Sequence, residues 1–196
     1  MEAVMESLKG QFLVAMPTMG DERFHEAVIY VVGHGEEGAM GLVVNQPVED
    51  MRFADILEEL GISGKDELIR LPSSVRDREV LRGGPVQRGR GFVLHSPDYF
   101  REENTYEVSD EICLTATLDI LKSIAFKPEP ADAVFALGYC GWGAGQLENE
   151  LALNGWLTVP FSRNLLFGTA LGDRYDIALA QLGITRASLS GAAGHA

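Results

Sequence analysis

Histidines and cysteines are the residues of this chain best suited to catalysis or metal binding. The four histidines include no pair at i, i+4 and no H-E-x-x-H pattern, which a zinc site on one helix would need. His34 and His95 each lie near the end of a predicted strand, so a site built in space with distant carboxylates such as Glu148 stays open. No local pattern indicates a ligand set, and we predict no metal and no cofactor.

Two cysteines, Cys113 and Cys140, stand in neither C-x-x-C nor another metal-type spacing. We expect both to be small buried hydrophobic residues without a disulfide, as is usual in a reducing compartment. Cys140 lies beside a glycine-rich turn, the one setting here that suits a nucleophile, but no G-x-S-x-G pattern accompanies it. We therefore predict no catalytic residue from local motifs.

A glycine-rich stretch runs from Gly138 to Gly145, between a predicted strand and a predicted helix. Free N–H groups and the dipole of a following helix would favour an anion at such a place. Gln146 stands where a G-x-G-x-x-G pattern needs its third glycine, so the likeness to a phosphate cradle is one of outline. The favoured interpretation is a tight turn that brings Trp142 against the core.

Arginine is concentrated in one segment. Residues 70–90 hold six arginines and only two acids, a net charge of +4, whereas the whole chain has a net charge of −13. A guanidinium group suits phosphate or carboxylate recognition, and the adjoining Gly83 and Gly84 would let the backbone approach a ligand closely. Two interpretations remain open here, a basic anion-binding area and surface arginines paired with the abundant carboxylates.

The overall composition excludes several classes of protein. A net charge of −13 over 196 residues opposes direct nucleic-acid binding, because phosphate contacts need a basic surface. The longest stretch without a charge, residues 133–147, has 15 residues and several glycines, which is too short for a membrane span. The N-terminal residues have no apolar run typical of a secretory signal. We expect a cytoplasmic protein.

Hydrophobic patterning predicts the elements that would position these residues. The spacing of Phe53, Ile56, Leu57 and Leu60 indicates an amphipathic helix over 51–60, ended by Gly61. Further helices are expected over 118–126, 146–154 and 174–182. Apolar or alternating runs predict strands over 11–16, 27–32, 39–45, 80–82, 91–95, 107–114, 133–139 and 156–159.

The expected fold follows from the order of these elements. The glycine-punctuated segment 33–38 fits the turn of an antiparallel hairpin, whereas 61–79 reads as an irregular polar connection. We predict an α+β fold: one compact domain over residues 1–185, with flanking helices and a mixed, mostly antiparallel sheet for which a barrel-like form is open. Residues 186–196 have too little apolar content to pack, so we expect a mobile C-terminal tail.

Four blocks, in order, resemble the AlgH/YqgE family of uncharacterised bacterial proteins. They cover Gly10–Pro17 with Asp21-x-x-Phe24, His34–Pro47, Gly83–Val86 with Arg90–His95, and Leu137–Glu148 with Asn154-x-Trp156-Leu157. Cys140, where the family often has alanine, and Gln46, where a basic residue is common, depart from its pattern. The resemblance implies a compact α/β-type fold around a mixed sheet, a cytosolic location, and no established enzymatic activity, cofactor or substrate.

The resemblance also carries a label of transcriptional regulator, for which the sequence offers no helix-turn-helix, zinc finger or basic helix. We therefore expect a non-enzymatic binding or regulatory protein, acting indirectly on transcription if at all, whose partner is a small anionic ligand or another protein. An alternative is a hydrolase or transferase with His95 and Glu148 as acid and base. The candidate crevice residues are Asn45, Gly83, Gly84, Arg88, Arg90, His95, Trp142, Gln146 and Glu148.

Overall fold

A computed structural model of the protein describes residues 6–192. The strands of this part are β1 (Phe12–Ala15), β2 (Val28–Gly35), β3 (Gly38–Val43), β4 (Pro47–Arg52), β5 (Glu79–Arg82), β6 (Val86–His95), β7 (Thr105–Glu107), β8 (Cys113–Thr115), β9 (Ala133–Gly143) and β10 (Trp156–Val159). The α-helices are α1 (Phe53–Glu59), α2 (Lys65–Leu68), α3 (Ser73–Arg76), α4 (Leu118–Phe126), α5 (Gln146–Ala152), α6 (Arg174–Gln181) and α7 (Arg186–Ala192). Shorter helical turns are η1 (Glu22–Phe24), the π-helical η2 (Asn164–Gly168) and η3 (Leu171–Asp173).

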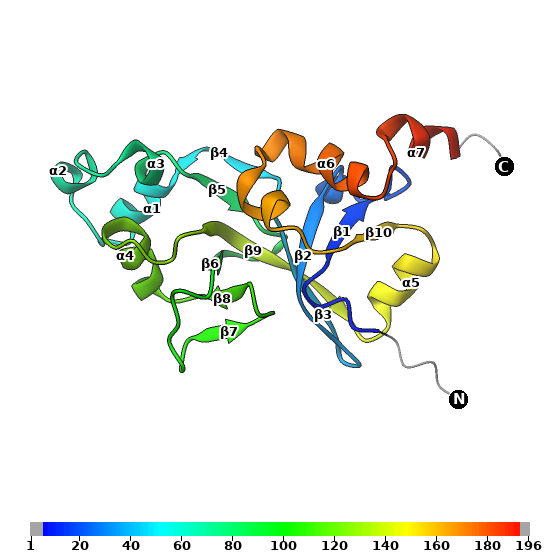
Figure 1. Ribbon diagram of the computed structural model, residues 1–196, viewed down its shortest axis with the longest axis horizontal. Helices are drawn as coiled ribbons and strands as arrows, with labels where there is room; N and C mark the ends of the chain where they lie inside the picture. The colour runs from blue at the N-terminus through cyan, green and yellow to red at the C-terminus, as the bar shows by residue number, and fades with distance from the viewer. Residues whose placement is uncertain (1–5, 193–196) are drawn as a thin grey trace.

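The strands of the described part form one curled, mostly antiparallel sheet, and strand β9 runs through its middle (Figure 1). The main order is β10-β1-β2-β3-β9-β6-β8-β7, and β5 pairs with both β4 and β9. The β5–β9 pair is parallel, which makes the sheet mixed. These features confirm the predicted α+β fold in a single domain.

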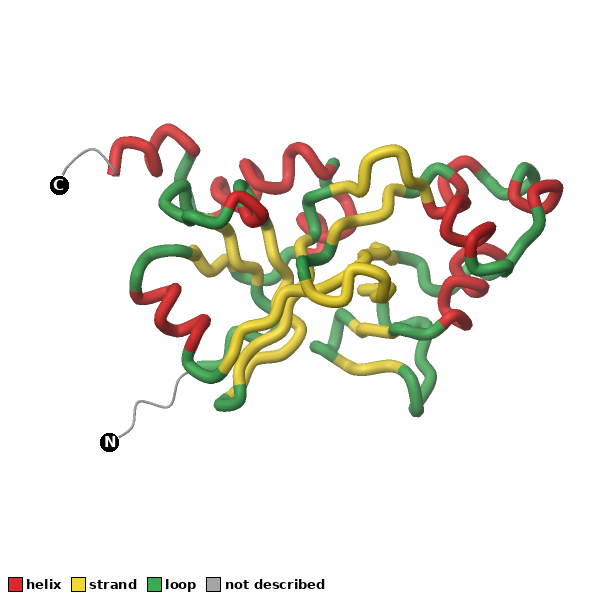
Figure 2. The backbone as a smooth tube through the Cα atoms, turned by 180° about the vertical axis from the view of Figure 1, so that it is seen from behind, coloured by secondary structure: helices red, strands yellow, loops and turns green. Residues whose placement is uncertain are grey.

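Strands β1 and β2 are buried on both faces. Their alternating side chains belong to two clusters: Phe12 and Tyr30 face the core beneath α6, whereas Leu13 and Ile29 face the core beneath α5. Burial on both faces is the physical reason why these strands read as continuous apolar runs. Figure 2 shows strands in the centre of the molecule, with helical segments toward both ends.

A third cluster lies at the other end of the sheet, where α1 and α4 cover β5, β6 and β9. Phe53 of α1 and Ile120 of α4 are fully buried there and pack with Phe135 of β9. Helix α1 begins where the Asp55 carboxylate accepts a hydrogen bond from the Arg52 backbone N–H at 2.7 Å. The amphipathic stripe thus forms the helix expected over 51–60, with Phe53–Glu59 as its observed extent.

Several boundaries differ from the sequence-based expectation. Strand β9 continues to Gly143, because residues 140–143 pair with residues 38–41 of β3. The glycines at 141 and 143 are therefore strand residues, and no open phosphate-type loop precedes α5. The strand expected over 107–114 is instead the hairpin of β7 and β8, since Val108 and Ser109 donate backbone hydrogen bonds to Ile112 and turn the chain.

Three segments are more ordered than predicted. Strand β4 pairs with β5 although its sequence, PVEDMR, lacks a hydrophobic signal. The connection 61–79 contains the short helices α2 and α3. The expectation of an unpacked tail is wrong for residues 186–192: they form α7, in which Leu189 is buried in the core and Arg186 pairs with Glu26 and Asp176. Residues 193–196 of that predicted tail lie outside the described part.

Between residues 6 and 192, the structure contains no helix whose length and hydrophobicity would suffice to span a membrane.

Candidate functional site

Gly83 and Gly84 lie where strands β5, β6 and β9 cross closely. A Cβ atom on Gly84, which has φ of +156°, would stand 2.2 Å from the carbonyl of Tyr139. A Cβ atom on Gly138 of β9, which has φ of +77°, would stand 2.4 Å from the Gly84 carbonyl oxygen. Only glycine fits such contacts. These glycines bring the backbones of the strands together, and Gly84 also lines the cavity described next.

A bulge in β6 separates the two candidate arginines. The ladder between β6 and β9 shifts between Val86 and Gly91, so the residues between them leave the regular pairing. Arg88 lines one cavity, whereas Arg90 stacks on the Phe92 ring at 5.2 Å and lines another. The sequence analysis placed Arg88 and Arg90 in one candidate crevice, whereas the structure places them at two separate cavities.

The cavity at Arg88 has a volume of about 380 Å³. Its polar wall includes Gln46 after β3, Arg82 at the end of β5, and Arg23 of η1. Its apolar wall is formed by Phe24, Val43, Val48, Pro85 and Leu137. Three arginines from separate elements thus meet at one hollow whose other walls could contact an apolar group.

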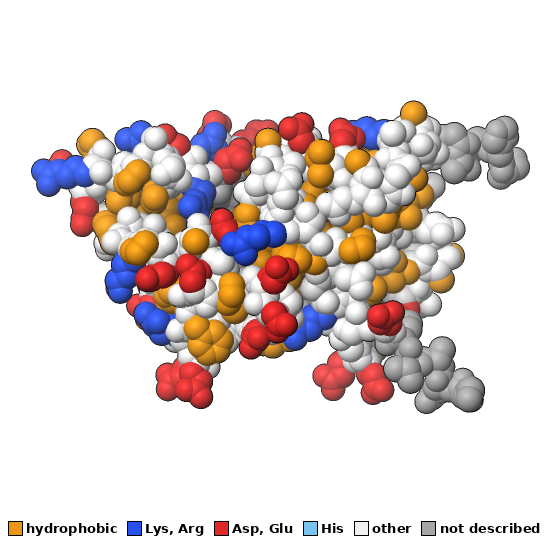
Figure 3. All heavy atoms as spheres, in the orientation of Figure 1, with side chains coloured by type: hydrophobic (Ala, Val, Ile, Leu, Met, Phe, Trp, Pro, Cys, Tyr) orange, Lys and Arg blue, Asp and Glu red, His pale blue; other side chains and the backbone are white. Residues whose placement is uncertain are grey.

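The three arginines differ in their pairing. Arg23 donates hydrogen bonds from Nε and Nη2 to the Asp21 carboxylate, which lowers the pKa of that carboxyl group. Arg82 and Arg88 are exposed and form no ion pair with any carboxylate of residues 6–192. On a protein with a net charge of −13, two such guanidinium groups at one cavity produce a local positive field. On the face that Figure 3 shows, acidic side chains lie along the upper and the lower edge, with Lys and Arg side chains scattered among them.

Asn45 and Gln146, two further crevice candidates, form hydrogen bonds with backbone groups. Neither side chain lines the cavity at Arg88 or the one at Arg90. Asn45 accepts from the Val28 N–H and donates to the Glu26 carbonyl, each at 2.8 Å. Gln146 accepts from the Gly143 N–H at 3.0 Å. These bonds match the turn-stabilising roles that the sequence also allowed for the two side chains.

Trp142 fills the core beneath α5, with 7% of its surface exposed. Its indole N–H donates to Oε2 of Glu150 at 2.9 Å, and the indole N–H of the buried Trp156 donates to the same oxygen at 2.7 Å. The other Glu150 oxygen accepts from Gln146 at 3.1 Å. Glu150 thus satisfies two buried tryptophans, which makes this cluster an element of the fold.

Glu148 pairs with His34 and not with His95. The His34 side chain is 3% exposed, accepts a hydrogen bond at Nδ1 from the Leu8 N–H at 2.9 Å, and donates from Nε2 to Glu148 at 2.8 Å. This bond lowers the pKa of Glu148. The acid–base pair of His95 and Glu148 that a hydrolase or transferase would need does not occur in this geometry.

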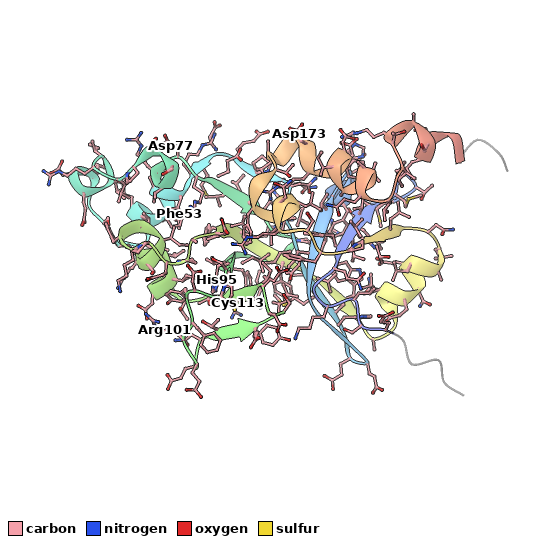
Figure 4. All side chains as sticks on the ribbon, in the orientation of Figure 1. Phe53, Asp77, His95, Arg101, Cys113 and Asp173 are labelled. Carbon is pink, nitrogen blue, oxygen red and sulfur yellow. The ribbon has the colours of Figure 1, made fainter. Side chains whose placement is uncertain are left out.

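His95 lies in the core at the end of β6, beside Cys113 of the neighbouring β8 (Figure 4). Its Nδ1 donates to the Ser96 carbonyl and its Nε2 accepts from the Thr115 hydroxyl, both at 2.8 Å. Thr105 donates to the same Thr115 oxygen at 3.0 Å. Because burial lowers the pKa of His95, its neutral form is favoured. This histidine is a satisfied core residue and lines neither the cavity at Arg88 nor the one at Arg90.

Both cysteines are free and buried, which confirms their prediction as small hydrophobic residues. Burial raises the pKa of Cys140 to about 12, so its thiol is protonated at neutral pH. Residues 6–192 contain no group of three histidine, cysteine or acidic side chains arranged to hold a metal ion.

Arg23, Phe24 and Gln46 are the site residues that sequence reasoning missed. Arg23 and Phe24 lie 59 and 58 positions before Arg82, and the intervening chain gives no sign that they meet it. One signal was present: Phe24 belongs to the Asp21-x-x-Phe24 block that carries the family resemblance. Gln46 lies in the next block, at one of the two positions that depart from the family's pattern.

Comparison with known proteins agrees with this fold and with the resemblance. A family model described as AlgH-like matches residues 12–187. A UPF0301 protein of Mesorhizobium japonicum is 57% identical over 189 residues, 96% of this chain and 93% of that protein. One from Bradyrhizobium diazoefficiens is 50% identical, over 96% of this chain and 88% of its own length.

Two solved structures are also similar. The solution structure of the AlgH protein from Pseudomonas aeruginosa is 39% identical and superposes with a TM-score of 0.77, covering 100% of both chains. A crystal structure of a protein from Corynebacterium diphtheriae, 17% identical, shares the fold alone, with a TM-score of 0.68 over 97% of this chain and 94% of that one. By the family model and by identity to relatives of nearly equal length, the chain belongs to the AlgH-like family.

Proposed function

We propose that this protein binds a small anionic ligand in the cavity lined by Arg23, Arg82 and Arg88. The supporting observation is the meeting of Arg82 and Arg88, both without an ion pair in residues 6–192, at one hollow of a strongly acidic protein. Arginine forks bind carboxylate or phosphate oxygens through two parallel hydrogen bonds. The proposed role is that of a non-enzymatic binding protein, and any effect on transcription would follow from ligand binding and not from direct DNA contact.

The cavity also indicates what the ligand would carry besides its charge. Phe24, Val43 and Leu137 present apolar surface beside the arginines. A ligand that combines an anionic group with an apolar body would contact both walls, and each would add to its affinity. A bare anion would contact the arginines alone.

Thermal shift measurements test this proposal with phenyl phosphate and inorganic phosphate as probes, because a ligand that binds the folded state raises the melting temperature. We expect phenyl phosphate to stabilise the protein more than inorganic phosphate. The double variant Arg82→Ala, Arg88→Ala should lose about tenfold or more in affinity for phenyl phosphate. Arg70→Ala is the matched control, since Arg70 is exposed on the segment after α2 and lines none of the three cavities.

The proposal fails if phenyl phosphate does not stabilise the protein at low salt, where attraction between exposed charges is strongest. It also fails if the double variant and Arg70→Ala reduce binding equally. That outcome would show a general effect of net charge in place of a site.

A further inference from the structure

A second cavity, of about 230 Å³, lies between the sheet and the C-terminal helical segment. It is lined by Arg78 and Glu79 at the start of β5, Asp132 just before β9, Phe167 of η2 and Arg174 at the start of α6. In Figure 1 the orange helical segment lies over the junction of β5 and β9, where this cavity is found. It shares no lining residue with the cavity at Arg88.

Arg174 is a buried cation whose hydrogen bonds, within the described part of the chain, go to backbone carbonyl groups alone. Only 5% of its surface is exposed. Its Nη1 donates to the Val44 carbonyl at 2.6 Å and its Nε to the Thr169 carbonyl at 3.0 Å. No carboxylate oxygen of residues 6–192 lies within 4.0 Å of it. Burial lowers the pKa of Arg174 to about 10, which reflects the cost of removing a charge from water without a counter-ion.

Arg78 is the second cation of this cavity. It is half-buried, and its Nη1 donates to the Ala133 carbonyl at 3.1 Å. Burial lowers its pKa as well. Like Arg174, it has no ion-pair partner within 4.0 Å in the described part. Two desolvated guanidinium groups from distant parts of the chain therefore line the same small hollow.

Two carboxylates also line this cavity. Asp132 pairs with the exposed Arg163 and also attracts Arg78 from beyond contact distance. Glu79 is exposed, forms no ion pair in residues 6–192, and attracts Arg174 from beyond contact distance. Because Arg163 shares Asp132 with Arg78, three guanidinium groups face two carboxylates here, which leaves one positive charge in excess.

We propose that this cavity binds a small oxyanion between Arg78 and Arg174. A bound oxyanion would supply the counter-charge that Arg174 lacks, and guanidinium groups are suited to oxygen pairs of phosphate or carboxylate. The volume of about 230 Å³ admits a phosphate or a short carboxylate, and Phe167 contributes an aromatic side chain to the lining. Phe167 belongs to a π-helical turn, a feature that is frequent at functional sites.

Isothermal titration with inorganic phosphate tests the site, with Arg78→Met and Glu79→Gln as variants of opposite expected effect. Arg78→Met should weaken phosphate binding about tenfold, because one of the two cations is lost. Glu79→Gln should strengthen binding about threefold, because it removes the one uncompensated negative charge at the rim while keeping the size of the side chain. Both residues are at most half-buried, so both variants should fold, as circular dichroism will show.

A further variant distinguishes phosphate binding at this site from binding at the cavity at Arg88. The double variant Arg82→Ala, Arg88→Ala should retain the phosphate binding that Arg78→Met loses. Titration with acetate under the same conditions decides whether the site prefers phosphate or carboxylate. The proposal is overturned if phosphate shows no saturable binding, if Arg78→Met binds as the unmodified protein does, or if Glu79→Gln weakens binding.

Discussion

The Nε2 atom of His34 donates a hydrogen bond to Oε1 of Glu148 at 2.8 Å across 114 positions of sequence. The bond joins the β2–β3 hairpin to helix α5. It also fixes the tautomer of His34, since Nδ1 accepts from the Leu8 N–H and the ring hydrogen must be on Nε2. The segment before β1 is thereby attached to the same histidine.

Glu148→Gln tests how much this pair stabilises the protein. Because a carboxylate accepts the His34 hydrogen bond more strongly than an amide does, we expect a loss of about 1 to 2 kcal/mol in the free energy of unfolding at neutral pH. The pKa of Glu148 is lowered in the folded state, so its contribution is present above the ordinary value of 4.5 and is lost as the pH falls through the folded-state pKa. Urea denaturation at neutral pH and at a pH below 4.5 measures this contribution. Glu103→Gln is the control, because Glu103 is exposed.

Glu150→Ala should destabilise the protein more than its half-buried position suggests. The change removes the shared acceptor of two indole N–H groups, those of Trp142 and Trp156, and we expect a loss of about 2 to 4 kcal/mol. Denaturation followed by tryptophan fluorescence measures it. Asn149→Ala, an exposed change on the same helix, should have little effect, and equal losses for the two variants would contradict the role given to Glu150.

Gly84→Ala and Gly89→Ala form a matched pair, since Gly84 lies just before β6 and Gly89 lies within it. The added methyl group would lie 2.2 Å from the Tyr139 backbone at position 84, whereas it meets nothing within 4 Å at position 89. We expect Gly84→Ala to lose about 3 kcal/mol or more, or not to fold, and Gly89→Ala to change stability by less than about 1 kcal/mol. Thermal denaturation compares them; a mild effect at position 84 would show that the strands can separate there.

His95 should make the stability of the protein depend on pH. Since burial lowers its pKa in the folded state, the unfolded chain binds the proton first as the pH falls. The contribution is fully present above the ordinary pKa of 6.5 and declines below it, by at most about 1.4 kcal/mol per pH unit. In urea denaturation between about pH 7 and 5, His95→Gln should show a smaller slope. Parallel pH profiles for the two proteins would refute this.

Neither cysteine should react readily in the folded protein. Both thiols are buried and burial raises the pKa of each, so the thiolate needed for attack is scarce and inaccessible. We expect labelling by a chromogenic disulfide reagent to be at least about a hundredfold slower in buffer than in urea. Rapid labelling of Cys140 in the folded protein would reopen a redox or nucleophilic role.

Sequence patterns predicted the elements whose burial is one-sided or complete. The stripe from Phe53 to Leu60 predicted α1, and continuous apolar runs predicted β1 and β2. Sequence patterns were less informative for elements that are stabilised by contacts with other elements of the fold. Strand β4 depends on its pairing with β5, and α7 depends on Leu189 reaching the core and on the ion pairs of Arg186.

The sequence by itself determined the family, the α+β class, the buried cysteines and an arginine-rich stretch beside Gly83 and Gly84. Only the tertiary structure decided which of those arginines meet, and with what. The register shift in β6 sends Arg88 to one cavity and Arg90 to another, while η1 brings Arg23 to Arg88. Local patterns record which side chains are buried, but contacts between distant residues depend on strand register and sheet curvature, which no local pattern specifies.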